Sequence, residues 1–494
     1  MKKSLKKYCL AATMMVVAGP AVAQDFNSSY FTQDFKYRHQ LNAAFGNDQG
    51  YFAIPVLGNM NIRMQGNFGL GDVLFKNPTT GKYDYTFMHP DVSVSDALAG
   101  FNKGDNKISG DIGLTILSAG FKAFGGYNII ELRERTSIGA ILPYDLFEFA
   151  KDLRNKSYEF DHIGLNAISF AELALGHSHQ VNDDLRIGAK LKVLMGVGRA
   201  DLKIDGMTAN LSGDKWVINS GEAQAEVNMK GIEFVNTTDE YERGGTYQHV
   251  DLGETDFDGV GLGGFGLGVD LGGEYQVIDG LKVSAALNDL GFINWSNSWL
   301  LKQKSGTFNF DGFHDIKIKK EAANGTTMDD QMDGYKDQIS DFVNLDNKGD
   351  QGSTSTMLSA TANLGVEYQL PGYKDLSFGL LGQHHFAGDY SWTEGRLSAN
   401  WTPLSWLDGG VNVAINSFCT SAGWILNIHP KGFNFFVGMD HILGKQSKEF
   451  IPLSSNMQVS VGMNIAWGGS KKSKEAKGSK KNKTQLETPD QFEW

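Results

Sequence analysis

Residues 457–467 read Met-Gln-Val-Ser-Val-Gly-Met-Asn-Ile-Ala-Trp, and they alternate between two kinds of side chain. Odd-numbered positions are large and apolar, whereas even-numbered positions are small or polar. Successive side chains of a β-strand point to opposite faces. One face suited to lipid and one suited to water are typical of a transmembrane β-barrel strand, but a soluble sandwich strand has a similar pattern. The N-terminus, the number of strands and the loop lengths decide between them.

The first 23 residues have the features of a secretory signal peptide. Basic residues up to Lys7 precede a short apolar stretch, Leu10 to Gly19, and Ala21-Val22-Ala23 resembles a cleavage site. We therefore expect an exported protein whose mature chain starts at Gln24. No later apolar run reaches the ~18 residues of a membrane helix. A closed barrel is then the remaining way to cross a membrane.

The composition excludes several classes of function. The chain has 60 glycines but only 10 prolines, which suits long continuous strands. Its 45 Lys and Arg residues against 57 Asp and Glu residues oppose nucleic-acid binding, which needs a basic surface. Of its two cysteines, Cys9 lies in the signal peptide, so Cys419 has no partner for an intrachain disulfide.

Alternation and turn residues predict an all-β chain, an antiparallel barrel of about fourteen strands. Turn signals such as Asp279-Gly280 separate the strands. The predicted strands are 52–70, 108–123, 127–141, 163–180, 185–205, 262–278, 281–290, 356–369, 375–386, 392–402, 408–418, 422–429, 433–441 and 456–467.

The loop lengths indicate how the barrel is oriented. If the N-terminus is periplasmic, every tight turn falls on the periplasmic side, and the long segments 71–107, 142–162, 206–261 and 291–355 fall outside. Outer-membrane barrels have this asymmetry. Segment 206–232 contains a further hairpin pattern, which would raise the total to sixteen strands if it crossed the membrane. We expect it in an external loop, together with an amphipathic helix over 143–154 near the barrel mouth.

The chain therefore divides into four predicted parts. Residues 1–23 are the signal peptide, 24–50 a periplasmic or plug-like segment, 51–469 the barrel, and 470–494 a disordered Lys-rich periplasmic tail. The tail has a composition that an acidic periplasmic partner would bind, although plain solvation explains it too.

Charged side chains of both signs are predicted to face the lumen. The candidates for substrate binding are Arg133, Arg135, Glu172, Arg186, Lys190, Lys192 and Arg396. One interpretation is a network of ion pairs that braces the wall, which we favour for most of them. The other is a polar path for a substrate, in which Lys190 and Lys192, on one face with Arg186, would hold a carboxylate.

No catalytic, cofactor or metal site stands out, so we expect no enzyme. Gly261-Leu262-Gly263-Gly264-Phe265-Gly266 matches G-x-G-x-x-G, but a strand pattern follows it where a dinucleotide site needs a helix. The pairs His177/His179 and His384/His385 lack a Cys or carboxylate at ligand spacing. Acidic stretches over 233–258 and 329–350 are interpreted as solvated surface; within the second, 346–350 only partly matches a calcium loop.

Two resemblances add to these patterns. The topology resembles that of the FadL-type long-chain fatty-acid transporters, and residues 37–45 resemble their Asn-Pro-Ala plug stretch, with Ala43 in place of proline. Residues 51–59, 142–147, 188–192 and 288–295 are similar to a family of Bacteroidota outer-membrane barrels. These resemblances imply an outer-membrane location and a barrel fold, and the second implies no particular substrate.

The leading functional hypothesis is uptake of a hydrophobic or amphipathic small molecule across the outer membrane. Barrels of about 8 strands are filled by side chains and those of about 16 leave a channel, so fourteen strands need a plug. The alternatives are a docking scaffold for surface or secretion proteins and a general porin. The expected partners are outer-membrane lipid and lipopolysaccharide, with an amphipathic ligand in the lumen.

Overall fold

The computed structural model describes residues 26–441 and 456–468, except for 214, 252–254, 258, 260, 304–305 and 312–326. The predicted signal peptide and Lys-rich tail lie outside the described residues. Among the helices that are described, none is both long enough and apolar enough to span a bilayer.

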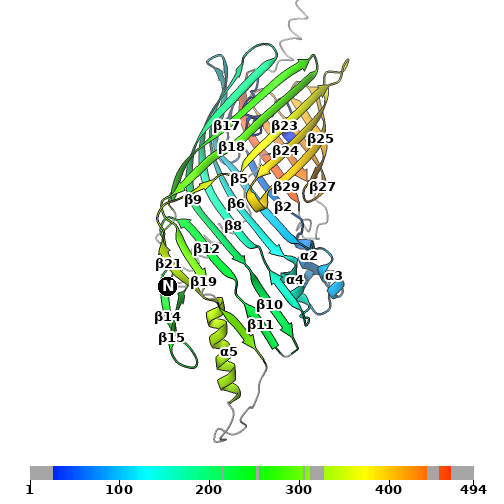
Figure 1. The fold of residues 1–494 in the computed structure, drawn as a ribbon. Helices are drawn as coiled ribbons and strands as arrows, with labels where there is room; N and C mark the ends of the chain where they lie inside the picture. Colours follow the sequence, from blue (N-terminus) through cyan, green and yellow to red (C-terminus); the bar gives the residue numbers. More distant parts are fainter. Residues whose placement is uncertain are drawn as a thin grey trace, which may run out of the picture.

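Fourteen antiparallel strands close into a barrel, which confirms the predicted fold class (Figure 1). Neighbouring strands in the chain pair around the wall, and the last strand, β29 (Met457–Trp467), completes the circle by pairing with β1 (Gly50–Ala53) and β2 (Met60–Gly66). The wall strands are β1 (Gly50–Ala53) with β2 (Met60–Gly66), β5 (Asp105–Ala123), β6 (Gly126–Pro143), β8 (Ile163–Gln180), β9 (Leu185–Asp205), β17 (Gly264–Ile278), β18 (Leu281–Trp295), β22 (Thr354–Met357) with β23 (Ala360–Gln369), β24 (Leu376–Phe386), β25 (Trp392–Leu404), β26 (Leu407–Asn416), β27 (Thr420–Ile428), β28 (Asn434–His441) and β29.

The predicted strand boundaries are accurate where alternation is unbroken. The predictions 163–180 and 185–205 coincide with β8 and β9. The first wall strand, predicted as continuous, is instead interrupted between β1 and β2, where Val56 has a φ of 68°. The neighbouring strand β5 also shifts register between Thr115 and Leu117. The first wall strand pairs Phe52 with Ala119 of β5 before the break, and its ladder with β5 resumes at Met60 and Leu114 beyond it.

The two faces of the wall differ as the alternation predicts. On β9, Ile187, Leu191 and Val193 are exposed on the outside of the barrel, whereas Lys190 and Lys192 are buried inside. A one-residue shift of register would exchange these two sets and place the lysines in lipid. The apolar exterior therefore fixes the register of the charged interior.

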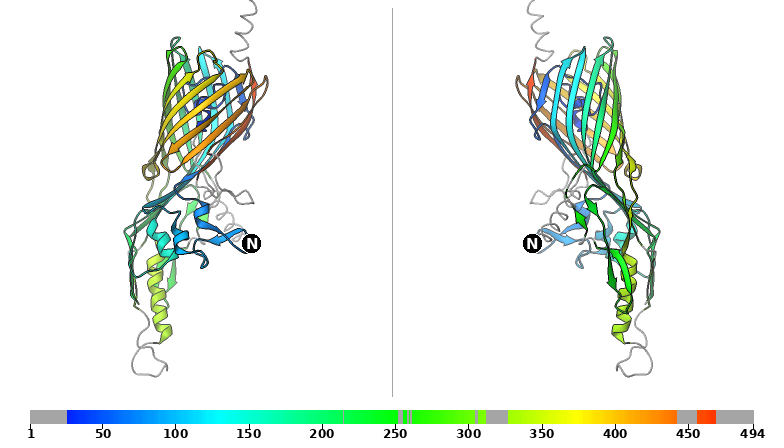
Figure 2. Two further views of the ribbon diagram at one scale, coloured as in Figure 1. Left: turned by 90° about the vertical axis from the view of Figure 1, so that its right-hand side faces the viewer. Right: turned by 90° about the vertical axis from the view of Figure 1, so that its left-hand side faces the viewer.

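One end of the barrel has short turns, and the other end continues into a second body, which we call the long-loop end (Figure 2). Beyond the barrel, the far half of β9 pairs with β12 (Glu222–Met229), which pairs with β19 (Trp299–Gln303) and through it with β21 (Leu345–Asp350). A separate sheet contains β7 (Ser157–Phe160), β10 (Met207–Ser212), β11 (Lys215–Asn219) and β20 (Thr307–Phe310). Segment 206–232 is therefore outside the barrel wall.

The smaller pairs and the helices also gather at the long-loop end. The pairs are β3 (Leu74–Lys76) with β4 (Tyr83–Thr86), β13 (Ile232–Glu233) with β16 (Asp256–Phe257), and β14 (Asn236–Glu240) with β15 (Thr246–Val250). Short helices α2 (Leu70–Val73) and α3 (Val94–Leu98) lie near α4 (Tyr144–Lys151), which begins directly after Pro143 and is shorter than the predicted helix. Its Phe147 stacks on Phe101 at 3.8 Å between ring centroids.

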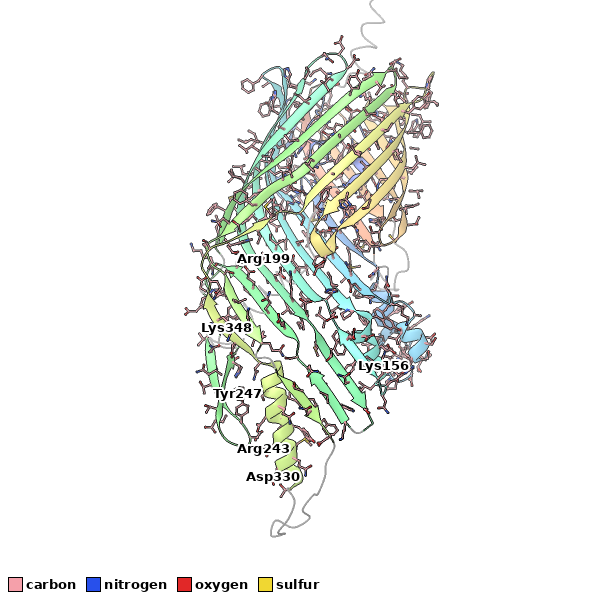
Figure 3. The ribbon with its side chains drawn as sticks, in the orientation of Figure 1. Lys156, Arg199, Arg243, Tyr247, Asp330 and Lys348 are labelled. Atoms are coloured by element: carbon pink, nitrogen blue, oxygen red, sulfur yellow. The ribbon has the colours of Figure 1, made fainter. Side chains whose placement is uncertain are left out.

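Helix α5 (Met328–Val343) was not predicted from the sequence, because its many aspartates suggested a solvated loop. Thr327 caps its first turn by accepting a hydrogen bond from the Asp330 amide, and acidic side chains there suit the positive end of the helix dipole. Arg243, from the β14–β15 hairpin, donates to the Asp330 carbonyl (Figure 3). The stretch 346–350 forms strand β21.

Candidate functional site

Residues 26–49 fill the barrel interior, and we call them the plug. In Figure 2 they are the dark-blue segment enclosed by the wall. Side chains of the wall donate hydrogen bonds to plug carbonyls: Asn288 Nδ2 to Leu41 O at 3.0 Å, and Asn363 Nδ2 to the same oxygen at 2.8 Å. Ser178 Oγ donates to Ala44 O at 2.5 Å. The wall therefore satisfies backbone groups that have no regular secondary structure of their own.

Glycines let the plug approach the wall closely. A Cβ atom at Gly188 would collide with the carbonyl oxygen of Ala43, and one at Gly272 with Oδ1 of Asn42. Asn42 also donates from Nδ2 to the Gly273 carbonyl at 3.2 Å and accepts from the Ala44 amide at 2.9 Å. The stretch 37–45, which resembles a plug motif, thus contains the residues that approach the wall most closely, at Gly188 and Gly272.

A β-bulge in β18 places two consecutive side chains inside the barrel. Asn288 and Asp289 are both buried, and Asp289 has a φ of 61°, in the left-handed region. The pairing of β17 with β18 shifts register at this point, opposite Asp270. Asp270 Oδ1 accepts a hydrogen bond from the Asp289 amide at 2.8 Å, which fixes the bulge. Asp and Asn tolerate this backbone conformation better than most residues.

The bulge centres a buried network of ion pairs. Asp289 Oδ1 lies 2.8 Å from Arg135 Nη1 and 2.6 Å from Lys192 Nζ. Lys192 Nζ is also 2.8 Å from Asp270 Oδ1, and Arg135 Nη1 is 3.2 Å from Glu172 Oε2. Lys190 Nζ lies 3.5 Å from Asp270 Oδ2. Because Lys192 already meets three carboxylates, its charge is balanced by the wall itself, which favours the bracing interpretation for it.

A second buried cluster joins the wall to the start of the plug. Arg396 lies 2.7 Å from Glu394 and 3.3 Å from Asp440. Asp440 accepts hydrogen bonds from the backbone amides of Asn27 and Ser28, at 2.8 and 2.6 Å. This arrangement is also consistent with a structural role.

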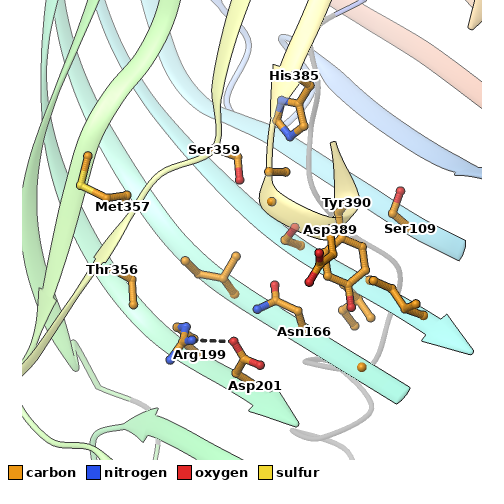
Figure 4. A pocket seen from close by; sticks show the side chains of 18 of the residues that line it. Ser109, Asn166, Arg199, Asp201, Thr356, Met357, Ser359, His385, Asp389 and Tyr390 are labelled. Carbon is orange, nitrogen blue, oxygen red and sulfur yellow. Dashed lines mark hydrogen bonds and ion pairs between the residues drawn. The ribbon is translucent and has the colours of Figure 1, made fainter. Parts of the chain in front are cut away.

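A cavity of about 790 Å³, the long-loop cavity, opens between the wall strands at the long-loop end (Figure 4). Arg135 and Asp289 belong to its lining, next to aromatic and aliphatic side chains. Arg199 and Asp201 pair at 2.7 Å on one side, and Tyr390 lies across from them. Burial raises the pKa of the Tyr390 hydroxyl, so it remains a neutral donor and acceptor. The apolar lining residues are Ile138, Ile141, Ile163, Ile168, Phe170, Leu202, Met357, Leu358, Phe386 and Trp392.

On the other side of the plug lies a cavity of about 590 Å³, the short-turn cavity. Its lining combines plug residues, such as Asp34 and Arg38, with turn residues, such as Asp184 and Asp279. It is more polar than the long-loop cavity and has the aspartates of three turns around it. The two cavities are thus separated by the plug and by the Asp289 network.

The structure distributes the seven predicted lumen residues among these features. Arg135 lines the long-loop cavity and Arg186 the short-turn cavity. Glu172, Lys190 and Lys192 belong to the Asp289 network, Arg396 to the plug-anchoring cluster, and Arg133 is buried. Sequence reasoning missed Asp270 and Asp289. Strict alternation places Asp289 on the outside once Asn288 faces inward, and only the αL tolerance of the Asn-Asp pair hinted at the bulge.

Comparisons with solved structures give similarity to outer-membrane channels. The toluene transporter TodX of Pseudomonas putida and the toluene transporter TbuX of Ralstonia pickettii each align over 91% of this chain and 95% of their own, with 9% and 10% identity and TM-scores of 0.38. A Pseudomonas aeruginosa FadL homologue covers 91% of this chain and 99% of its own, at 9% identity and a TM-score of 0.37.

Comparison of the sequence with family models identifies the family of the chain. No curated protein matches this chain significantly. A family model matches residues 43–440, which include the end of the plug and thirteen of the wall strands described above. The chain therefore belongs to the family of unknown function DUF5723.

Proposed function

We propose that this protein is an outer-membrane channel for the uptake of hydrophobic or amphipathic small molecules, with its long-loop end outside the cell. The observation that carries the proposal is the long-loop cavity. Its volume of about 790 Å³ lies within the ~300–1,000 Å³ of small-molecule sites. Apolar side chains with a few charged groups at the base suit a molecule that has an apolar body and a polar end.

The plug argues for a gated path and against a general porin. It fills the lumen between the two cavities, and wall side chains hold its backbone at Leu41 and Ala44. A substrate bound in the long-loop cavity could therefore cross the barrel only after a conformational change of the plug or the wall. Arg135 is the predicted lumen residue best placed to meet a polar end, because it lines this cavity.

Uptake of a fluorescent fatty acid by cells that express the protein tests the proposal. Ile168→Asn places an amide in the apolar lining and should reduce uptake several-fold, whereas the conservative Ile168→Val should not. Single-channel recording of the purified barrel should show little steady conductance. A large constant conductance for sugars and ions, or uptake that is equal in both variants and in cells without the protein, would contradict the proposal.

A docking scaffold is the second candidate, favoured by the sheets beyond the barrel. The β7–β10–β11–β20 sheet and helix α5 lie outside the wall and contribute nothing to its closure. Loops of this size exceed the needs of a simple pore. Purification from gently solubilised membranes tests this candidate: a stoichiometric protein partner, with no uptake activity, would favour docking over transport.

A further inference from the structure

Three side chains from distant parts of the chain meet where the plug touches the wall near the short-turn end. They are Asp34 of the plug, Asp408 of β26, and His429, which directly follows β27. The candidate ligand atoms of the three all lie within 4.8 Å of one another. Asp408 and His429 are 2% and 1% exposed. No spacing in the sequence indicates this group, because the fold alone joins the three segments.

Both distances from His429 are too long for a hydrogen bond, and the one to Asp408 matches the spacing of two ligands on one cation. His429 Nε2 is 3.4 Å from Asp408 Oδ1 and 3.8 Å from Asp34 Oδ2. A charge-assisted N–H···O hydrogen bond is shorter, about 2.7–2.9 Å. Two atoms that bind one tetrahedral Zn²⁺ at about 2.0–2.2 Å lie about 3.3–3.6 Å apart. Both ring nitrogens of His429 are buried without a hydrogen-bond partner in the described part of the chain.

The surroundings hold the carboxylate of Asp408 in place. Asn427 donates to Asp408 Oδ1 at 2.6 Å, Asn434 donates to Asn427 at 2.7 Å, and Asn464 donates to Asn434 at 3.0 Å. Tyr37 of the plug donates to Asn464 at 2.6 Å, so the chain of hydrogen bonds returns to the plug. Partners of this kind orient the ligands of metal sites.

The charge and the access also suit a divalent cation. As ligands of a cation, two carboxylates and one imidazole supply a charge of −2, and the ammonium of Lys36 is directed to amide oxygens of Asn47 and Gln49 at 3.1 and 2.7 Å. Asp34 and Asp408 line the short-turn cavity, which supplies an entry path and room for a water ligand. One imidazole among the ligands favours Zn²⁺ over Ca²⁺ or Mg²⁺, which prefer oxygen alone.

We propose that Asp34, Asp408 and His429 form a Zn²⁺ site that ties the plug to the barrel wall. This differs from the sequence-based expectation of no metal site, and it is independent of what the channel carries. Zn²⁺ bridges the plug to β26 and to the end of β27 through three protein ligands, and the fourth position faces the short-turn cavity.

Metal analysis of the full mature protein in detergent tests the site. After treatment with EDTA, loading with ZnCl₂ and dialysis, the wild type should retain one Zn²⁺ per chain. Asp408→Asn and His429→Gln should retain at least tenfold less. His441→Gln, which alters another buried histidine, is the matched control and should bind as the wild type does. Co²⁺ loading should give the visible absorption of a tetrahedral site in the wild type and the control only.

Hydrogen–deuterium exchange then tests the link to the plug. At a Zn²⁺ concentration 100 times Kd, opening of the segment around Asp34 should slow by up to about 100-fold, and Asp34→Asn should abolish this effect. Asp34 is partly exposed on the plug, so its replacement should leave the wall folded, as heat-modifiability on a gel will report. Equal Zn²⁺ retention in the wild type and the ligand variants, or none in the folded wild type, would overturn the proposal.

Discussion

At the scale of single residues, the fit of the plug depends on the absence of two side chains. Gly188→Ala and Gly272→Ala together would drive methyl groups into Ala43 and Asn42. Overpacking of this kind costs about 1–3 kcal/mol, which we expect the plug to relieve by moving away from β9 and β17. Single-channel recordings should therefore show more frequent openings. Gly395→Ala is the control, because a Cβ there meets no atom within 4 Å, and the prediction is wrong if all variants conduct alike.

The alternation on β9 leads to a second prediction at this scale. Leu191→Lys places an ammonium on the lipid face, which costs about 2–4 kcal/mol at mid-bilayer, so insertion should fall. Lys190→Leu changes a buried position whose partner Asp270 keeps its contact with Lys192 at 2.8 Å, so the barrel should still fold. Heat-modifiability on a gel measures both. If Leu191→Lys inserts normally and Lys190→Leu aggregates, then Leu191 faces the lumen and Lys190 faces the lipid, contrary to the assignment made here.

At the scale of elements, the bulge of β18 holds a charge on which the wall depends. Asp289→Asn leaves Arg135 and Lys192 buried with one carboxylate fewer between them. Breaking a buried pair in this way typically costs about 3–5 kcal/mol. The midpoint of urea unfolding should fall clearly below that of the wild type. Asp279→Asn, which removes the exposed pair with Lys374, should leave the midpoint unchanged. An equal effect of both changes would contradict a special role for the bulge.

Elements differ in how far the sequence could predict them, and the reason is the range of the interactions that form them. Strands β8 and β9 were predicted to the residue, because period-two alternation and the Asn182-Asp183-Asp184 turn are local signals. The bulge at Asp289 and helix α5 were missed, because a register shift and a helix capped within an acidic run override the local pattern. The sequence pattern of β12 also does not show which strand it pairs with, and in the structure it pairs with the far half of β9.

At the scale of the whole molecule, the candidate site was predictable only in part. Inward-facing charges follow from alternation, so Arg135 and Lys192 could be named. Their partners Asp270 and Asp289 lie on the neighbouring strands β17 and β18, where the bulge turns Asp289 inward. The meeting of Asp34, Asp408 and His429 arises from the closure of the barrel around the plug. Closure brings together segments that are hundreds of residues apart, and a single sequence has no signal for such contacts.

The same architecture separates the wall from the sheets beyond it, which leads to a last prediction. Residues 206–221 contain β10 and β11, and Asp205 pairs directly with Glu222 across the base of this hairpin. Replacing 206–221 with Asn-Gly should close β9 onto β12 through a two-residue turn. Every wall strand keeps its partners, so the variant should insert and run as a folded barrel on a gel. If the long-loop cavity carries the substrate, uptake of a fluorescent fatty acid should persist while any stable protein partner is lost. Loss of uptake in a folded variant would instead make this sheet part of the path.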